Sequence, residues 1–204
     1  MMGTLIMMVK APIAGRVKTR LAADLGVARA SCLYRAMLRG AIEEATAGSW
    51  RTIAAVAPTV AMSHPIFATP ALGVVPQSNG SLGDRLIAAI EMAPKGPVIV
   101  IGGDAPQMRR ADLQQAFTMM RRHDAVFGRA EDGGFWLMGL ARRQKAPTLM
   151  ENVRWSSRHT LADTVASLPR NFKVGYLKTL IDVDHAEDLA RLGARPFLRS
   201  VRRP

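Results

Sequence analysis

Residues 98–106, with the sequence VIVIGGDAP, constrain the fold of this chain most strongly. The first four residues are all apolar and β-branched, which is typical of a strand buried on both faces of a parallel sheet. Two glycines then free the backbone from strand geometry, and Pro106 prevents the strand from continuing. Asp104 is therefore predicted at the carboxyl end of a central strand, where ligands bind in open α/β sheets. The alternative is that Asp104 caps a helix that begins near Ala111.

Strands and helices are predicted to alternate along the chain. We expect strands at 4–9, 51–57, 72–75, 98–101, 124–128, 135–140 and 173–177. We expect helices at 28–47, 82–92, 111–122 and 186–192, with short helices inside 59–70 and 152–164. This alternation predicts a mostly parallel α/β sheet flanked by helices. A single domain is expected over residues 1–194, followed by a basic, poorly ordered tail at 195–204.

The charge of the chain points to phosphorylated ligands. The formal net charge is +12, but the aromatic residues are few and do not alternate with the basic ones. A stacking platform for single-stranded nucleic acid is therefore not expected, and small phosphorylated ligands are favoured over nucleic acid. The four histidines lack the spacing of zinc ligands.

The cellular setting is predicted from cysteine use and hydropathy. Cys32 is the only cysteine, which excludes an internal disulfide, and its apolar helical surroundings predict a core position. The chain shows no signal peptide, and no apolar run approaches the length of a membrane span. These features predict a cytoplasmic protein without a membrane span.

A basic loop follows the first predicted strand, with the sequence KAPIAGRVKTRL at residues 10–21. Backbone N–H groups in such a loop, and the helix that follows it, favour an anion, and lysine and arginine add charge. The loop lacks the Gly-Lys-Ser/Thr order of a Walker A motif and the three glycines of a dinucleotide-binding turn. We predict a phosphate-binding loop, with a solvated basic loop as the alternative. Its candidate residues are Lys10, Ala11, Pro12, Gly15, Arg16, Lys18 and Arg20.

Two polar turns could face the same ligand. Gln77 and Arg85 flank a flexible turn in which Ser81 is a plausible helix N-cap, and a plain loop with a cap is the alternative. Asp132, Gly133 and Gly134 lie between two apolar strands, either as a ligand-facing turn or as a simple hairpin turn.

Two late carboxylates complete the candidate metal site. Asp182 and Asp184 share one face if their stretch is extended, whereas Asp184 could instead cap the helix at 186–192. Separated carboxylates hold a hard divalent cation through oxygen, and Mg²⁺ typically needs only one or two of them in addition to substrate phosphates. We therefore predict that Asp104, Asp182 and Asp184 bind Mg²⁺ or Mn²⁺. The metal and the basic loop would stabilise charge on a leaving diphosphate or pyrophosphate.

Four motifs together resemble a known bacterial family. They are KAP at 10–12 with GRVKTRL at 15–21, GDAP at 103–106, DGGFW at 132–136, and Trp155-Ser156. Their combination, over nearly the whole chain to about Leu192, resembles the DUF2064 family, often labelled as glycosyltransferases and in some cases linked to arsenosugar biosynthesis. That family is similar to the GT-A superfamily of nucleotide-diphospho-sugar transferases, and to the 2-phospholactate and molybdenum-cofactor guanylyltransferases.

The resemblance implies a Rossmann-like GT-A fold, a nucleotide-linked donor and a divalent metal. By it, Asp104 occupies the usual metal position, Arg16 and Lys18 belong to the phosphate loop, and Asp182 or Asp184 is the second acid. One feature departs from the pattern, because GT-A glycosyltransferases commonly show Asp-X-Asp where this chain has Asp104-Ala105-Pro106. This departure leaves fewer metal ligands and two reaction types open.

We therefore expect a metal-dependent transferase that acts on a nucleotide-activated donor, with Asp104, Lys18 and Asp132 as its catalytic candidates. Glycosyl transfer from a nucleoside-diphosphate sugar is the leading reaction. The first alternative is nucleotidyl transfer, in which an acceptor phosphate attacks the α-phosphate of a nucleoside triphosphate and pyrophosphate leaves. The second is a non-catalytic nucleotide-binding protein. The acceptor is not identified by the sequence, and a homodimer is a candidate assembly.

Overall fold

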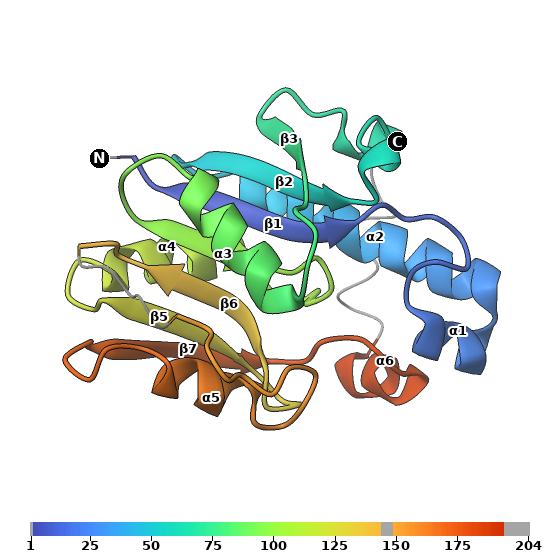
Figure 1. The fold of residues 1–204 in the computed structure, drawn as a ribbon. Helices are drawn as coiled ribbons and strands as arrows, with labels where there is room; N and C mark the ends of the chain where they lie inside the picture. Colours follow the sequence, from blue (N-terminus) through green and yellow to red (C-terminus); the bar gives the residue numbers. More distant parts are fainter. Residues whose placement is uncertain (1, 144–148, 194–204) are drawn as a thin grey trace.

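A computed structural model describes residues 2–143 and 149–193 of the chain. The described residues form a seven-stranded sheet with the strand order β3-β2-β1-β4-β6-β5-β7 (Figure 1). The strands are β1 (Thr4–Lys10), β2 (Arg51–Ala57), β3 (Leu72–Pro76), β4 (Val98–Ile101), β5 (Ala125–Ala130), β6 (Phe135–Leu140) and β7 (Val174–Leu180). The helices are α1 (Thr19–Leu25), α2 (Val27–Thr46), α3 (Leu82–Met92), α4 (Arg110–Met119), α5 (Thr160–Ala166) and α6 (Ala186–Leu192), with short 3₁₀ turns at Thr59–Ala61 and Pro65–Phe67.

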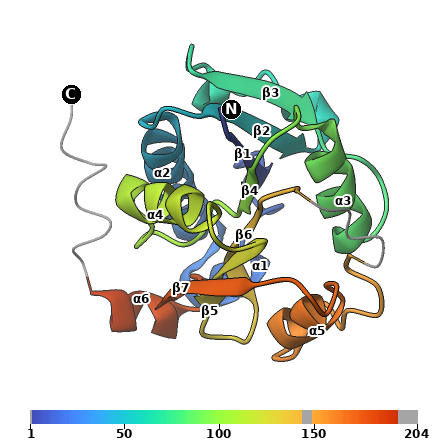
Figure 2. The same cartoon turned by 90° about the vertical axis from the view of Figure 1, so that its left-hand side faces the viewer.

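The helices cover both faces of the sheet, as Figure 2 shows for α2 and α4 on one side and α3 and α5 on the other. Alternating residues of β1 supply both layers, because successive side chains of a strand point to opposite faces. Leu5 and Met7 belong to the core cluster that includes residues of α2 and α4, whereas Ile6 packs with the residues of α3. β4 is buried along its whole length, which agrees with its unbroken apolar sequence.

The direction of the strands determines which loops meet at the same edge of the sheet. β1 pairs in parallel with β2 and β4, and β5 pairs in parallel with β7, whereas β6 runs antiparallel to β4 and β5. The carboxyl ends of β1, β4 and β7 therefore meet at one edge, and the turn between β5 and β6 joins them there. The predicted fold class, a mostly parallel sheet flanked by helices, is confirmed.

The structure corrects two expectations. Cys32 is exposed rather than buried, because the inward face of α2 is formed by residues such as Tyr34 and Leu38. A helix that the sequence reasoning missed, α1, follows the basic loop directly, and Lys18 is its N-cap. The predicted tail at 195–204 lies outside the described residues. Within the described ranges, no helix combines the length and the apolar character that crossing a bilayer would need.

Candidate functional site

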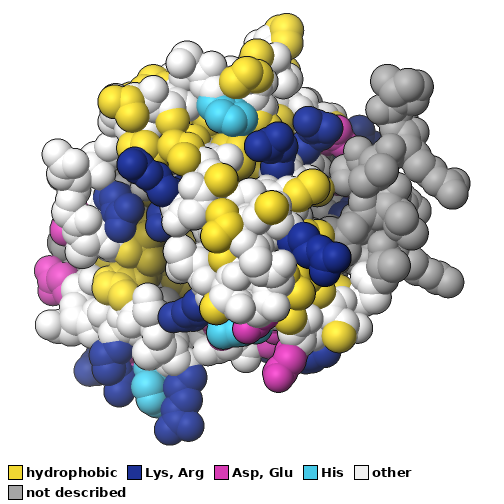
Figure 3. All heavy atoms as spheres, turned by 90° about the vertical axis from the view of Figure 1, so that its right-hand side faces the viewer, with side chains coloured by type: hydrophobic (Ala, Val, Ile, Leu, Met, Phe, Trp, Pro, Cys, Tyr) yellow, Lys and Arg dark blue, Asp and Glu magenta, His cyan; other side chains and the backbone are white. Residues whose placement is uncertain are grey.

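A cavity of about 540 Å³ opens at the edge where the carboxyl ends of the strands meet. Figure 3, which views the molecule from the right-hand side of Figure 1, shows Lys and Arg side chains around hollows that contain hydrophobic side chains. The cavity is lined by eight of the predicted site residues: Lys10, Lys18, Arg20, Asp104, Asp132, Gly134, Asp182 and Asp184. The structure therefore brings together residues from the loop after β1, the end of β4, the β5–β6 turn and the segment after β7.

Lys18 lies at the centre of the acidic cluster. Its Nζ donates a hydrogen bond of 2.8 Å to Asp104 Oδ2 and one of 2.7 Å to Asp184 Oδ1. Arg20 adds a longer contact of 3.4 Å to Asp184 Oδ2. The side chain of Lys18 is only 7% exposed, so these charges interact with less screening than surface charges do.

Three backbone features explain how Lys18 reaches the carboxylates. Residue 18 adopts the left-handed conformation (φ 47°, ψ 49°), which is rare for a non-glycine residue and often marks a functional position. The carbonyl of Lys18 accepts the N–H of Ala22, which fixes the residue at the start of α1. The buried Val17 anchors the preceding loop in the core.

The segment after β7 is tied directly to the loop after β4. The N–H of Val183 donates to the carbonyl of Asp104 over 3.2 Å, which places Asp182 and Asp184 beside Asp104. Asp184 does not cap α6. The N-cap of that helix is His185, and the Asp188 carboxylate accepts the N–H groups of both Asp184 and His185.

Asp104 is not a helix cap either. The N-cap of α4 is Arg109, and its backbone N–H is accepted by Asp112 at 2.9 Å. Both competing cap interpretations are therefore wrong, and the two carboxylates line the cavity, where they pair with Lys18.

Asp182 is the least satisfied carboxylate of the cluster. Within the described part of the chain, its Oδ1 atom is buried and has no hydrogen-bond partner. Burial, followed by the charges of Asp104 and Asp132, raises the pKa of Asp182 from 3.8 to about 8. A buried carboxylate oxygen without a donor is a place where a cation would be stabilising.

The donor set fits Mg²⁺ or Mn²⁺ in type. Asp104, Asp182 and Asp184 offer hard oxygen atoms, which is the ligand chemistry that these cations prefer. Among residues 2–143 and 149–193, no three His, Cys, Asp or Glu side chains form a ready-made metal cage. The ammonium of Lys18 lies between two of the three carboxylates instead.

The charged groups of the cluster shift each other's pKa values. Burial of Lys18 disfavours its charged form, but Asp104 and Asp184 outweigh this effect and raise its pKa. Burial likewise works against the ionised form of Asp184, and the Lys18 ammonium outweighs it and lowers the pKa of that carboxyl. Tyr34 lines the same cavity, and burial together with the charge of Asp104 raises the pKa of its hydroxyl.

The β5–β6 turn is both a hairpin turn and part of the cavity. Asp132 Oδ1 accepts the N–H of Gly134 at 2.8 Å, and the Ala130 N–H donates to the Gly134 carbonyl. Gly133 has a φ of +88°, and a Cβ atom there would lie 2.2 Å from the carbonyl oxygen of Arg158. Only glycine allows this turn to pack against the loop that precedes α5.

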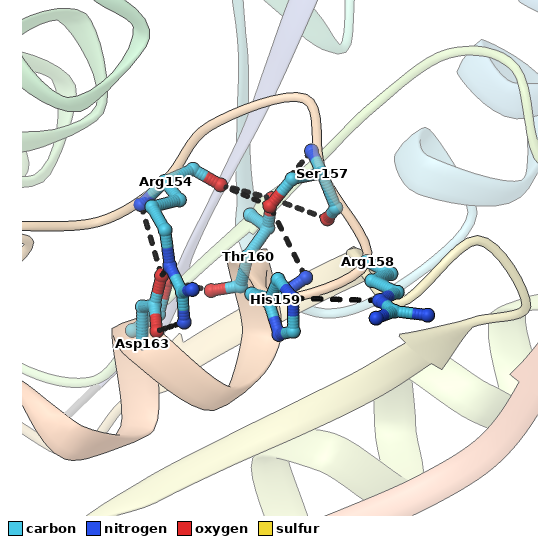
Figure 4. A network of polar contacts seen from close by, with 7 residues as sticks. Arg154, Ser157, Arg158, His159, Thr160 and Asp163 are labelled. Carbon is cyan, nitrogen blue, oxygen red and sulfur yellow. Dashed lines mark hydrogen bonds and ion pairs between the residues drawn. The ribbon is translucent and has the colours of Figure 1, made fainter.

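That loop carries Trp155 and Ser156 into the cavity lining. Figure 4 shows how it is held: Arg154 forms two side-chain hydrogen bonds of 2.8 Å to Asp163, one to each carboxylate oxygen. Hydrogen bonds from Arg154 hold the pKa of Asp163 well below its usual range. The hydroxyl groups of Ser157 and Thr160 both donate to the Arg154 carbonyl, which closes the network.

Several predicted site residues lie outside the cavity lining. Gln77 donates to the carbonyls of Val9 and Ala55 and accepts from Arg85, so it joins the ends of β1 and β2. Ser81 caps α3 as expected, and its hydroxyl accepts the Asp84 N–H. The other predicted residues absent from the lining are Ala11, Pro12, Gly15, Arg16 and Gly133, of which Arg16 is exposed in the loop between β1 and α1.

The sequence reasoning missed an apolar and aromatic wall of the cavity. Its members are Tyr34, Leu82, Leu86, Phe135, Trp136 and Trp155. Tyr34 lies in a helical apolar pattern that marks it as core, and nothing in its spacing reveals that its hydroxyl donates to the Lys10 carbonyl at 2.9 Å. Phe135, Trp136 and Trp155 belong to the motifs at 132–136 and 155–156, which are the sequence signal for their part of the wall.

Comparison with known proteins places this geometry in context. A family model described as "Uncharacterized protein conserved in bacteria (DUF2064)" matches residues 41–157. A 3-phospho-D-glycerate guanylyltransferase of Phenylobacterium zucineum (strain HLK1) is 32% identical over 132 residues, which is 60% of this chain and 60% of that protein. The match thus spans less than two thirds of the relative's length.

Two solved structures share the fold. A protein of Desulfovibrio desulfuricans G20, provisionally assigned as a nucleotide-diphospho-sugar transferase, is 25% identical with a TM-score of 0.86 over 100% of this chain and 91% of its own. Rv0371C of Mycobacterium tuberculosis H37Rv, solved in complex with manganese, has a TM-score of 0.56 and 20% identity over 94% of this chain and 98% of its own. The names of the first two of these proteins support the prediction that this chain is a transferase.

Proposed function

Because this chain belongs to the DUF2064 family, we propose that it is a metal-dependent nucleotidyltransferase that joins a nucleotide to a small phosphorylated acceptor. The acceptor's phosphate oxygen would attack the α-phosphorus of a nucleoside triphosphate. The bond from that phosphorus to the bridging oxygen would break, and pyrophosphate would leave. The observation that carries the proposal is the arrangement of Lys10, Lys18 and Arg20 beside three carboxylates in one cavity.

Asp104, Asp182 and Asp184 would hold the divalent cation. A bound Mg²⁺ or Mn²⁺ supplies charge stabilisation on the phosphate oxygens during transfer. Phosphoryl-group chemistry depends mainly on positioning and electrostatics, so no cysteine or serine nucleophile is required of the protein.

The basic residues would bind the donor's phosphates. Lys10 lines the cavity from the end of β1 and Arg20 from the first turn of α1, and Arg16 is exposed in the loop between these elements. Trp155 and Phe135 contribute an apolar surface to the same lining, which suits the ring of a nucleobase or the carbon skeleton of an acceptor. The hydrogen bonds between Arg154 and Asp163 would keep Trp155 in position.

Three observations favour nucleotidyl transfer over glycosyl transfer. The metal-binding candidates are divided between the end of β4 and the segment after β7, and the chain has Asp104-Ala105-Pro106 in place of Asp-X-Asp. In addition, the similar protein of Phenylobacterium zucineum is named a guanylyltransferase. Glycosyl transfer from a nucleoside-diphosphate sugar remains the second candidate, supported by the assignment of the Desulfovibrio desulfuricans structure.

The leaving group distinguishes the two reactions. We would incubate the protein with Mg²⁺ or Mn²⁺ and 3-phospho-D-glycerate, supply each nucleoside triphosphate in turn, and measure pyrophosphate release. Parallel reactions would supply nucleoside-diphosphate sugars and follow nucleoside diphosphate release. We expect pyrophosphate with at least one triphosphate, and only when both the acceptor and the metal are present. Asp104→Asn should abolish release, whereas Glu91→Gln, which removes an exposed carboxylate of α3, should not.

Release of a nucleoside diphosphate from a sugar donor, without pyrophosphate from any triphosphate, would contradict the proposal and support the second candidate. Testing other phosphorylated three-carbon acids in the same assay would extend the acceptor range beyond the one suggested by the relative.

A further inference from the structure

The ammonium of Lys18 occupies a position that suits a metal ion. It contacts carboxylates from two distant segments, Asp104 after β4 and Asp184 after β7, at 2.8 and 2.7 Å. We propose that Lys18 serves as a placeholder cation in the metal-free protein and leaves the carboxylates for the donor's phosphates when the metal–nucleotide complex binds. This inference rests on the proposed function, because it assumes a metal-bound nucleotide in the same cavity.

The Lys18 ammonium sets the distance between the two carboxylate oxygens that it contacts. Because one nitrogen atom bonds both carboxylate oxygens, those oxygens are no farther apart than the two hydrogen bonds laid end to end. A divalent cation bridging the same two oxygens would bring them somewhat closer, since Mg²⁺–oxygen distances are about 2.1 Å. The ammonium therefore maintains the approximate spacing of a metal site without supplying the full charge.

The ammonium of Lys18 does not satisfy every carboxylate of the cluster. The cluster contains three carboxylates, whereas the ammonium reaches only two of them, and the buried Oδ1 of Asp182 has no partner within the described residues. A cation with a higher charge and more coordination positions would satisfy the group better than one ammonium does. The cluster is therefore arranged for an occupant other than Lys18.

The side chain of Lys18 can move while the backbone of the residue stays in place. The carbonyl of Lys18 is bonded to Ala22, and its left-handed conformation is maintained at the start of α1. The four-carbon stem of lysine rotates about single bonds, so the ammonium can change partners without a change in the loop. Lys18 also lines the cavity in which Lys10 and Arg20 would meet the phosphates.

The proposal predicts that Lys18 competes with the metal when no nucleotide is present. Lys18→Met removes the charge and keeps the length of the side chain. We expect this variant to bind Mn²⁺ alone about tenfold more tightly than the wild type or better, since charge-assisted hydrogen bonds no longer have to be broken. The same variant should bind the Mn²⁺ complex of a non-hydrolysable nucleoside triphosphate at least about tenfold more weakly, because the phosphates lose a cationic partner.

Isothermal titration calorimetry at fixed pH and ionic strength would measure both affinities. Lys10→Met is the matched control, because it removes a cation from the same cavity lining. Among residues 2–143 and 149–193, no carboxylate forms an ion pair with Lys10. We expect Lys10→Met to leave the affinity for Mn²⁺ alone within about twofold of the wild-type value, since an unpaired charge there acts only through a screened field.

Unchanged or weaker binding of Mn²⁺ alone by Lys18→Met would overturn the proposal and identify Lys18 as a purely structural ion pair. Tighter binding of both Mn²⁺ and the metal–nucleotide complex would also overturn it, because Lys18 would then obstruct the site without contacting phosphates. An equal gain in Mn²⁺ affinity for Lys10→Met would mean that general charge removal, rather than exchange at the carboxylates, causes the effect.

A measurement on the wild-type protein covers the case in which Lys18→Met does not fold. Brief acetylation followed by peptide mass spectrometry would report the accessibility of the Lys18 amine, with Lys95 as an exposed reference. We expect low labelling without ligands, higher labelling with Mn²⁺ alone, and low labelling again with Mn²⁺ and the non-hydrolysable triphosphate. Labelling that does not rise with Mn²⁺ alone would overturn the proposal.

These readouts are separate from catalysis. If the protein released no pyrophosphate but Lys18→Met bound Mn²⁺ more tightly and the metal–nucleotide complex more weakly, the proposed reaction would be wrong and the proposed role of Lys18 would be supported. If pyrophosphate were released but Lys18→Met bound Mn²⁺ no more tightly than the wild type, the proposed reaction would be supported and the proposed role of Lys18 as a placeholder cation would be wrong.

Discussion

Replacing Asp182 with asparagine should stabilise the metal-free protein, and more so as the pH rises. In the folded protein, burial and the charges of Asp104 and Asp132 raise the pKa of Asp182 from 3.8 to about 8. Between these two values the folded state binds a proton that the unfolded state has lost. The stability contributed by this proton is complete below pH 3.8 and is lost as the pH rises towards 8.

The size of the effect follows from the linkage relation. Inside this window a single group changes the free energy of unfolding by about 1.4 kcal/mol per pH unit. Asp182→Asn removes the group, so the difference in unfolding free energy between variant and wild type should grow in favour of the variant by about 2–3 kcal/mol from pH 5 to pH 7. Urea denaturation of both proteins in the presence of a chelator, at the two pH values, would measure it.

Asp184→Asn is the matched control for this experiment. Lys18 outweighs burial and lowers the pKa of Asp184, so the stability from this carboxylate is present above its unfolded pKa and is lost only in more acidic solution. Its stability difference from wild type should change much less between pH 5 and pH 7 than that of Asp182→Asn, because the Asp184 charge is the smallest of the causes that act on the pKa of Asp182. A pH-independent difference for Asp182→Asn, or one that shrinks with rising pH, would refute the reasoning about the buried carboxylate.

Three further predictions follow from other contacts. Asp104→Asn should leave the protein folded and abolish metal-dependent nucleotide binding, and unchanged calorimetric affinity with Mg²⁺ or Mn²⁺ would remove Asp104 from the metal site. Gly133→Ala should destabilise the protein by at least about 1–2 kcal/mol in urea denaturation, because φ is +88° and the new Cβ would meet the Arg158 backbone; an unaltered midpoint would contradict the close approach. Tyr34→Phe should cost about 1 kcal/mol of stability through the lost hydrogen bond to the Lys10 carbonyl, and a variant as stable as wild type would show that this bond contributes nothing.

The sequence predicts the seven strands, the mostly parallel class of the sheet and the carboxylates of the acidic cluster, but not the order of the strands or the antiparallel direction of β6. The run at 98–101 predicts a buried central strand because four consecutive β-branched apolar side chains are typical of a strand covered on both faces. Once β1, β4 and β7 run in the same direction, their carboxyl ends share an edge, so the meeting of Lys18, Asp104 and Asp184 follows from topology.

The remaining features depend on contacts that local patterns do not encode. Helix α1 is short and its N-cap is a lysine in the left-handed conformation, whose side chain forms no capping hydrogen bond, so the sequence signal of a helix start is missing. The side-chain amide of Gln77 donates hydrogen bonds to backbone carbonyls of β1 and β2, and these contacts depend on how the strands pack in space. Similarly, the raised pKa of Asp182 comes from burial beside residues far away in the sequence.

The most direct test of the account is a crystal structure of the protein with Mn²⁺ and a non-hydrolysable nucleoside triphosphate, in which anomalous scattering locates the metal. The account predicts manganese bound by Asp104 and at least one of Asp182 and Asp184, with the Lys18 ammonium on the phosphates. Manganese bound elsewhere, with Lys18 still between Asp104 and Asp184, would contradict it.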